Sequence, residues 1–258
     1  FYRWSLAWLI LLPFTYKELL KKKNYIFNNI GLFIVLGITA VTIFNSALFY
    51  SLKFTQVISG VLMISTIPVM IIIFCWLFRI EKTNLYQIFG VIFSLLGVVV
   101  IITKADLKIL LNLNFNKGDI WMVVAMFSWA MYSALLRKKK LEVSQLSLLQ
   151  TIITAGLIFL LPAYLVELSL GYKTSINLPF VLTLTYVVIF PGLASFIFWI
   201  KGISIIGSNR SGIFLHLMPI FSTIMAILIF GEKFMIFHSI GAVLIIAGII
   251  LSSRGQHI

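Results

Sequence analysis

Two stretches of this 258-residue chain, "FRIEKTNLYQIFGVIFSLLG" at residues 78–97 and "FGEKFMIFHSIGAVLIIAG" at 230–248, share a Glu-Lys pair followed by two glycines seven residues apart. A shift of 151 residues superimposes them, and a proline upstream follows the same shift. Five identities at one offset, without a gap, indicate an internal duplication. The paired positions are Pro68 and Pro219, Glu81 and Glu232, Lys82 and Lys233, Gly90 and Gly241, and Gly97 and Gly248.

The composition places this duplication in a membrane. Hydrophobic residues make up 61% of the chain and charged residues 10%, and the mean hydropathy is +1.11. An ordinary soluble domain is about 45–50% apolar and about 25% charged, so it could not bury this many apolar side chains in water. We therefore expect the solvent around this chain to be lipid.

Continuous apolar runs predict nine membrane-spanning helices. Most runs reach the roughly 20 residues that a helix needs to cross about 30 Å of hydrocarbon. They lack the alternation of transmembrane strands, and a helix bonds its own backbone amides in lipid. The predicted class is therefore an all-α polytopic membrane protein. The runs lie near residues 4–16, 29–52, 56–78, 85–103, 119–136, 145–166, 178–200, 208–230 and 235–252.

The longest connection, from Lys104 to Asp119, divides the runs into two halves, residues 1–104 and 118–254. The first run is short and has no basic leader or small-residue cleavage site, so we expect one further helix before Phe1 and ten in total. Two halves with an odd number of helices must insert in opposite orientations. The sequence thus predicts two inverted five-helix repeats, as in many secondary transporters, whose substrate sites lie at the midplane.

Basic residues predict the orientation. If alternate connections share a side, 13 of the 20 Lys and Arg residues lie on the side of the C-terminus, which is then predicted to be cytoplasmic. The net charge of +13 reflects this orientation and attraction to anionic lipid. It does not indicate nucleic-acid binding, because the basic residues form no continuous patch. The larger group is Lys17, Lys21, Lys22, Lys23, Arg79, Lys82, Arg137, Lys138, Lys139, Lys140, Lys201, Arg210 and Arg254, and the smaller is Arg3, Lys53, Lys104, Lys108, Lys117, Lys173 and Lys233.

The runs "GVLMISTIPVMIIIFCWLFRIEKTNLYQIFGVIFSLLGVVVI" at 60–101 and "SGIFLHLMPIFSTIMAILIFGEKFMIFHSIGAVLIIAGIIL" at 211–251 resemble the last two helices of each half in EamA-type transporters of the drug/metabolite transporter superfamily. That pattern is a helix with a mid-span Pro, a Glu just past its end, and a glycine-containing helix. The resemblance covers residues 1–254 and implies a carrier in the bacterial cytoplasmic (inner) membrane that exports amino acids or similar small metabolites. It does not identify the substrate.

The sequence offers little for catalysis. All seven acidic residues fall at span ends or in loops, Cys75 is the only cysteine, and no Gly-x-Ser-x-Gly, His-Glu-x-x-His or phosphate-loop spacing occurs. We therefore expect a secondary carrier that is not an enzyme and needs no cofactor or metal. The alternative is a channel or a non-transporting packing subunit. The expected partners are a small-molecule substrate, the lipid bilayer and a second copy of the chain.

Polar and aromatic side chains inside the spans are candidates for the substrate path. Burying an unpaired amide or imidazole in hydrocarbon costs several kcal/mol, so these groups should face the bundle interior or a wet cavity. For each residue, a helix–helix hydrogen bond or an interfacial belt is the alternative. Because no fixed charge is expected at this depth, we predict a neutral or zwitterionic substrate. The candidates are Asn45, Tyr50, Ser65, Thr66, Trp129, Tyr132, Tyr186, Trp199 and His216.

Energy coupling has three open explanations. Coupling of transport to an ion uses His216, the one ionisable group near a midplane, or it uses a group on the upstream helix. In the third explanation, transport is an exchange that is not coupled to an ion.

The duplicated residues are predicted to act structurally. The two glycines of each repeat lie on one helix face, where small residues let helix backbones approach. Each proline frees a carbonyl near the centre of its span and favours a kink or hinge. Each Glu-Lys pair stands at a helix end, where capping and ion pairing are expected. The packing and hinge positions are Gly90, Gly97, Gly241, Gly248, Pro68 and Pro219, and the expected ion pairs are Glu81 with Lys82 and Glu232 with Lys233.

Single cysteines in a variant that lacks Cys75 test the predicted topology. A cysteine at Lys22 should resist a membrane-impermeant thiol reagent in intact cells, and one at Lys108 should react, because the two positions are predicted on opposite sides. Labelling after permeabilisation controls for buried thiols. The reverse labelling pattern would contradict the orientation.

Overall fold

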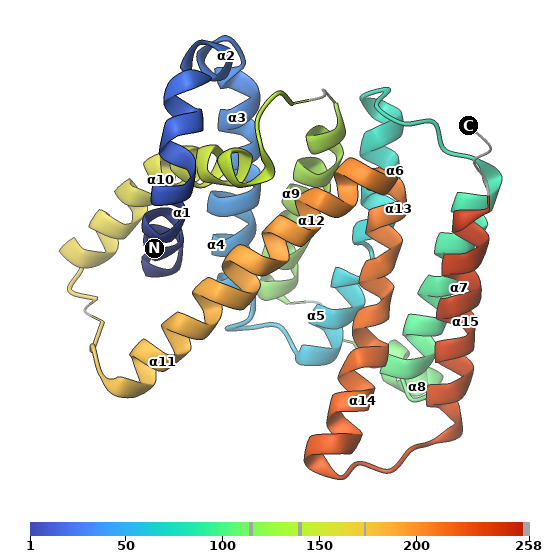
Figure 1. The fold of residues 1–258 in the computed structure, drawn as a ribbon. Helices are drawn as coiled ribbons and strands as arrows, with labels where there is room; N and C mark the ends of the chain where they lie inside the picture. Colours follow the sequence, from blue (N-terminus) through green and yellow to red (C-terminus); the bar gives the residue numbers. More distant parts are fainter. Residues whose placement is uncertain (114–115, 139–140, 173, 255–258) are drawn as a thin grey trace.

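The computed structural model describes residues 1–113, 116–138, 141–172 and 174–254, and every regular element in these ranges is a helix (Figure 1). Eight helical segments are long and apolar enough to cross a membrane, which confirms the predicted all-α polytopic class. They are Ile30–Ser51, Ile58–Leu77, Leu85–Ile102, Lys117–Arg137, Gln145–Ser169, Leu178–Ile206, Ser208–Phe230 and Ile236–Ser253.

Helix α1 (Tyr2–Lys21) covers the first expected span, near residues 4–16. It is 20 residues long but carries Arg3, Lys17, Glu18 and Lys21, and it is not among the eight apolar segments. Length and composition therefore support eight of the nine expected spans.

Four of the eight spans are built from shorter helices in succession. Two contain π-helical segments, η1 and η2, and the 151-residue shift carries η1 onto residues 189–194 of η2. The other two break near their centres, and Pro68 and Pro219 are each the second residue of the helix after the break. The four spans consist of α3 (Ile30–Gly37), η1 (Ile38–Ile43) and α4 (Phe44–Ser51); α5 (Val57–Ile64) and α6 (Ile67–Leu77); α11 (Leu178–Val187), η2 (Val188–Ala194) and α12 (Ser195–Ile206); and α13 (Ser208–Ile213), η3 (Phe214–Leu217) and α14 (Met218–Phe230).

Successive spans run in opposite directions between two ends of the bundle (Figure 1). One end, here called the α2 end, carries α2 (Lys23–Asn28), the turn before α7 (Leu85–Ile102) and the last residues of α15 (Ile236–Ser253). The other, the α8 end, carries α8 (Leu107–Leu111) and the connections from α4 to α5 and from α14 to α15. The remaining long helices are α9 (Lys117–Arg137) and α10 (Gln145–Ser169). Lys139, Lys140 and Lys173, which contribute to the charge asymmetry, lie outside the described residues.

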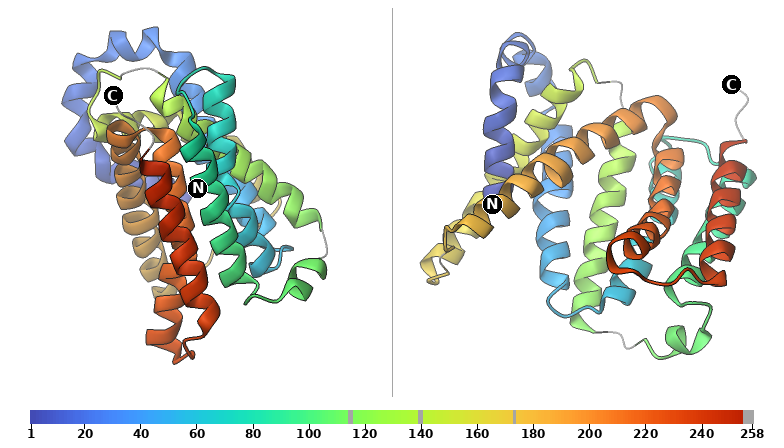
Figure 2. Two further views of the ribbon diagram at one scale, coloured as in Figure 1. Left: turned by 90° about the vertical axis from the view of Figure 1, so that its right-hand side faces the viewer. Right: turned by 60° about the horizontal axis from the view of Figure 1, so that its bottom comes forward.

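Helices α7 and α15 pack side by side in antiparallel directions through all four duplicated glycines, a contact called here the glycine seam (Figures 1 and 2). A Cβ atom on Gly90 would lie 2.5 Å from the carbonyl oxygen of Gly248, and one on Gly97 would lie 2.5 Å from that of Gly241. The 151-residue shift relates Gly90 to Gly241 and Gly97 to Gly248. Applied to the Gly90–Gly248 contact, it therefore gives the Gly241–Gly97 contact, in which the two helices have exchanged roles. Such an exchange requires a two-fold axis perpendicular to the helices, which is the relation between inverted repeats.

Replacing Gly97 with Leu should destabilise the fold, because a Cβ atom there also meets the backbone nitrogen of Ile245 at 2.9 Å. Overpacking costs about 1–3 kcal/mol, so the thermal unfolding midpoint in detergent should fall by roughly 2–4 °C for each kcal/mol. Gly31→Leu is the matched control, since nothing lies within 4 Å of a Cβ atom at that position. Equal midpoints for the two variants would contradict the tight seam.

Candidate functional site

A cavity of about 780 Å³ lies in the half of the bundle toward the α8 end. Asn45 and Tyr50, two of the predicted residues, line it from α4. Its members Lys53 and Glu167 are exposed, and the buried Trp4 forms part of its inner wall. Small-molecule sites combine such apolar walls with a few oriented polar groups. Further aromatic lining residues are Phe1, Phe49, Trp121 and Tyr164.

The π-helical segment η1 positions Asn45, which follows it in the chain. The Asn45 Nδ2 donates to the carbonyl oxygens of Ala40 at 2.9 Å and Val41 at 3.0 Å. This fixes the amide so that its Oδ1 accepts a hydrogen bond from Nη2 of Arg3. The guanidinium carbon of Arg3 also lies 4.6 Å from the ring centre of Trp4, within cation–π distance. The cavity therefore holds a fixed positive charge, and the expectation of a charge-free interior is wrong.

An aromatic cluster adjoins the inner wall of this cavity. Trp129 of α9 lies at its centre, and Trp4 contacts the same cluster through Phe196, at 4.9 Å between ring centroids. The Nε1 of Trp199 donates to Oγ of Ser133 at 3.1 Å, which fixes the ring. The structure thus brings together three predicted residues, Trp129, Tyr132 and Trp199. Four ring centroids lie 4.6 to 5.6 Å from that of Trp129, those of Phe44, Tyr132, Phe196 and Trp199.

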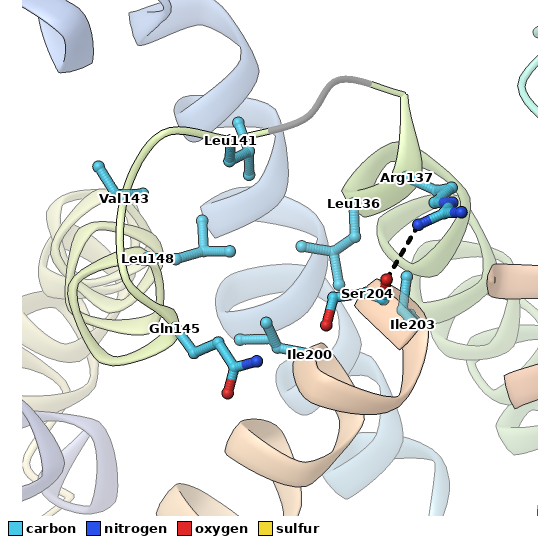
Figure 3. A pocket seen from close by; sticks show the side chains of 9 residues that line it. All are labelled: Leu136, Arg137, Leu141, Val143, Gln145, Leu148, Ile200, Ile203 and Ser204. Atoms are coloured by element: carbon cyan, nitrogen blue, oxygen red, sulfur yellow. Dashed lines mark hydrogen bonds between the residues drawn. The ribbon is translucent and has the colours of Figure 1, made fainter. Parts of the chain in front are cut away.

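A second cavity, of about 540 Å³, lies beyond the aromatic cluster toward the α2 end. Figure 3 shows mostly aliphatic side chains around it, from α9, α10, α12 and the residues just before α10, Leu141 and Val143. Its members Leu136 and Ile203 each follow a cluster residue, Tyr132 and Trp199, by four positions on the same helix face. Among the described residues none lines both cavities. The aromatic cluster therefore has neighbours in the lining of each cavity, Trp4 in the larger and Leu136 and Ile203 in the smaller.

His216 joins the two broken spans. Its Nε2 donates to the carbonyl oxygen of Ser65 at 2.8 Å, and its Nδ1 lies 2.5 Å from Oγ of Ser94. Ser65 and His216 are themselves 151 residues apart, so the axis between the repeats passes between them. The hydroxyls of Ser65 and Thr66 bond carbonyl oxygens of α5. The structure places these three predicted residues together, outside the lining of both cavities.

Glu81 connects the two halves at the α2 end. Its carboxylate accepts hydrogen bonds from the backbone N–H groups of Ser208 at 2.8 Å and Asn209 at 3.1 Å, and lies 3.6 Å from Nε of Arg137. We call these contacts the Glu81 latch. Gly207 permits them, because its φ is 87° and a Cβ atom there would lie 2.7 Å from Oε1 of Glu81.

The expected ion pair between Glu81 and Lys82 is replaced by this latch. Lys82 is exposed on the turn, whereas the free N–H groups at the start of α13 face the Glu81 carboxylate. At the α8 end Glu232 is exposed, and no ion pair joins it to Lys233 in the described part of the chain. The 151-residue shift would place an equivalent latch between Glu232 and the start of α5. The two ends therefore differ although the repeats are alike.

Glu18 makes a second connection at the α2 end, to the start of α10. It accepts hydrogen bonds from the backbone N–H of Ser144 at 2.7 Å and from Oγ of Ser147 at 2.6 Å. Desolvation opposes ionisation, yet the hydrogen bonds from Ser144 and Ser147 and the charge of Lys22 lower the pKa of Glu18 below its ordinary value.

Tyr186 lies apart from the other predicted residues. Its side chain on α11 is 60% exposed and contacts Phe190 at 5.2 Å between ring centroids. The sequence interpretation missed Arg3, which it counted only among the basic residues on the side opposite the C-terminus. The feature that could have indicated its role is that it is the single charged residue of the apolar stretch "FYRWSLAWLILLPF". The sequence analysis also missed Phe44 and Phe196, because a phenylalanine without a polar group does not stand out within an apolar span.

Known proteins share this sequence and architecture. The EamA-like transporter family matches residues 1–103 and 116–254. The chain is 28% identical over 248 residues to the uncharacterized transporter YyaM of Bacillus subtilis (strain 168), covering 95% of this chain and 79% of that protein. It is 28% identical over 223 residues to an uncharacterized transporter of Archaeoglobus fulgidus, covering 86% and 76%. A solved crystal structure shares the fold, with a TM-score of 0.67 and 18% identity over 85% of this chain and 75% of that chain. This chain therefore belongs to the EamA-like transporter family and is an integral membrane protein with a transporter role.

Proposed function

We propose that this protein is a secondary carrier that exports small neutral or zwitterionic metabolites, such as amino acids, across a bacterial cytoplasmic membrane. Residues 1–104 and 118–254 form its two inverted halves, and the α2 end, with the C-terminus, faces the cytoplasm. The observation that supports this proposal is the pair of cavities, the larger toward the α8 end and the smaller toward the α2 end, with the aromatic cluster around Trp129 next to residues that line each of them. A metabolite that crosses from one cavity to the other then passes that cluster.

The unequal ends of the bundle support alternating access. The Glu81 latch joins the halves at the α2 end, whereas the larger cavity lies toward the α8 end, where Glu232 is exposed. In a carrier made of inverted repeats, exchanging the conformations of the two repeats closes one end and opens the other. We assign the present arrangement to the state that is open toward the α8 end, the side on which an exporter with this orientation releases its substrate.

Counterflow in proteoliposomes tests the carrier function. Liposomes preloaded with a mixture of the twenty amino acids should accumulate labelled amino acids in a saturable way, because a carrier returns loaded more readily than empty. Flux that rises linearly with concentration, without stimulation by the preloaded mixture, would favour a channel.

Asn45→Ala and Trp129→Ala should each reduce saturable counterflow about tenfold, since a contact worth about 1.4 kcal/mol is lost at the cavity wall or in the aromatic cluster. Trp76→Ala is the matched control, because Trp76 is 72% exposed on α6. Rates and half-saturation equal to those of the parent in both test variants would contradict this placement of the path.

Exchanging the charges of Glu81 and Arg137 should not restore the latch. The double variant E81R/R137E keeps an opposite-charge pair, but an arginine side chain cannot accept hydrogen bonds from the N–H groups of Ser208 and Asn209. Its thermal unfolding midpoint should therefore stay below that of the parent and below that of E81Q, whose side-chain carbonyl oxygen can still accept a hydrogen bond from these N–H groups. The exposed pair of Lys22 and Glu142, 3.8 Å apart, is the control, because exchanging its charges should change little. A parental midpoint for E81R/R137E would mean that the ion pair alone forms the latch.

A further inference from the structure

We infer that Arg3 binds the carboxylate of the transported metabolite, so that the cavity toward the α8 end selects small carboxylic acids, zwitterionic amino acids among them. This inference rests on the proposed carrier function and changes its substrate class: it keeps the zwitterionic metabolites, excludes the neutral ones and admits simple carboxylates. It also excludes uncharged analogues such as amides and esters from efficient transport.

The position of Arg3 makes its charge costly. It bonds Asn45, which lies six residues before the end of the span Ile30–Ser51, or about 9 Å inside the span at 1.5 Å per residue. Charged side chains at such depths are rare and usually pair with an opposite charge or face a wet cavity. Arg3 lines the cavity. Within the described residues, no carboxylate lies within 4.0 Å of its guanidinium nitrogens.

The surroundings hold the Arg3 guanidinium in one orientation. Its Nη2 donates to Asn45 Oδ1, and its carbon lies 4.6 Å from the ring centre of Trp4 and 5.7 Å from that of Phe49. The Asn45 amide is itself fixed by two backbone carbonyls of the π-helical segment. A guanidinium has five N–H donors, and the described protein contacts use one of them. The rest are available to a ligand.

The chemistry of the wall favours a carboxylate over a phosphate. A planar guanidinium matches the two oxygens of a carboxylate in a bidentate pair. A guanidinium can pair with a phosphate in the same way, but a phosphate dianion carries two negative charges, and the second Lys or Arg of the wall, Lys53, is exposed, with its Nζ 5.6 Å from the ring centre of Tyr50. The remaining wall contains one carboxylate, the exposed Glu167, and apolar surface from Trp4, Phe49 and Tyr50 that suits the uncharged part of a small metabolite.

The experiment uses the whole protein in liposomes loaded with a small-molecule extract of the cells that produce it. Released compounds are identified by mass spectrometry against protein-free liposomes. Every compound whose release depends on the parent protein should carry a carboxylate. Release of these compounds should fall at least about tenfold in Arg3→Gln, because the variant loses the charged hydrogen bonds between the guanidinium and the carboxylate of the substrate. Lys17→Gln, a charge removal at an exposed position of the same helix, should match the parent.

Arg3→Lys is a second variant, because Arg3→Gln can fail to fold. It keeps the charge but loses the bidentate fork, so its half-saturation for the released acids should rise at least about fivefold. Parent-dependent release of compounds without a carboxylate, phosphate esters included, would overturn the inference. So would parental kinetics in a folded Arg3→Gln or in Arg3→Lys. Absence of any parent-dependent release would instead overturn the proposed carrier function.

Discussion

A break in a membrane helix exposes backbone carbonyls to hydrocarbon, and a side chain must satisfy them. The rest of this structure depends on that constraint. The carbonyls of Ala40 and Val41 in the π-helical segment bond the Asn45 amide, and the central break before Pro68 bonds His216 through the Ser65 carbonyl. Polar side chains are therefore found where the helices are irregular. The irregularities recur at a spacing of 151 residues, but the polar side chains do so only in part, because Ser65 corresponds to His216 whereas Asn45 corresponds to Phe196.

Much of the fold could be predicted from the sequence because lipid imposes a simple pattern. The apolar runs coincide with the eight spans, and the shared offset of the four glycines anticipates the antiparallel contact of α7 and α15. Periodicity alone gives these features, since each depends on one helix and its nearest neighbour. The charged ends of α1 are what separate it from the other spans.

The site was harder to predict, because its residues come together only through the packing of distant helices. Arg3 and Asn45 are 42 positions apart, and Glu81 meets residues 127 and 128 positions away. A neighbouring Lys82 is a reasonable partner for Glu81 on the sequence, yet the start of α13 offers two backbone donors that no sequence pattern marks. Tyr186 has the composition of a cavity residue, but its helix face is exposed in the structure.

The glycine seam has a further consequence for how such a protein is assembled. In it, each glycine of one repeat meets the non-equivalent glycine of the other, so Gly90 faces Gly248 and Gly97 faces Gly241. This is the geometry of an isologous interface, in which one surface is complementary to itself. A chain with a single repeat and the same two glycines could pair through this seam with an inverted copy of itself. The covalent link between the repeats then adds proximity and fixed stoichiometry to a contact that each half already encodes.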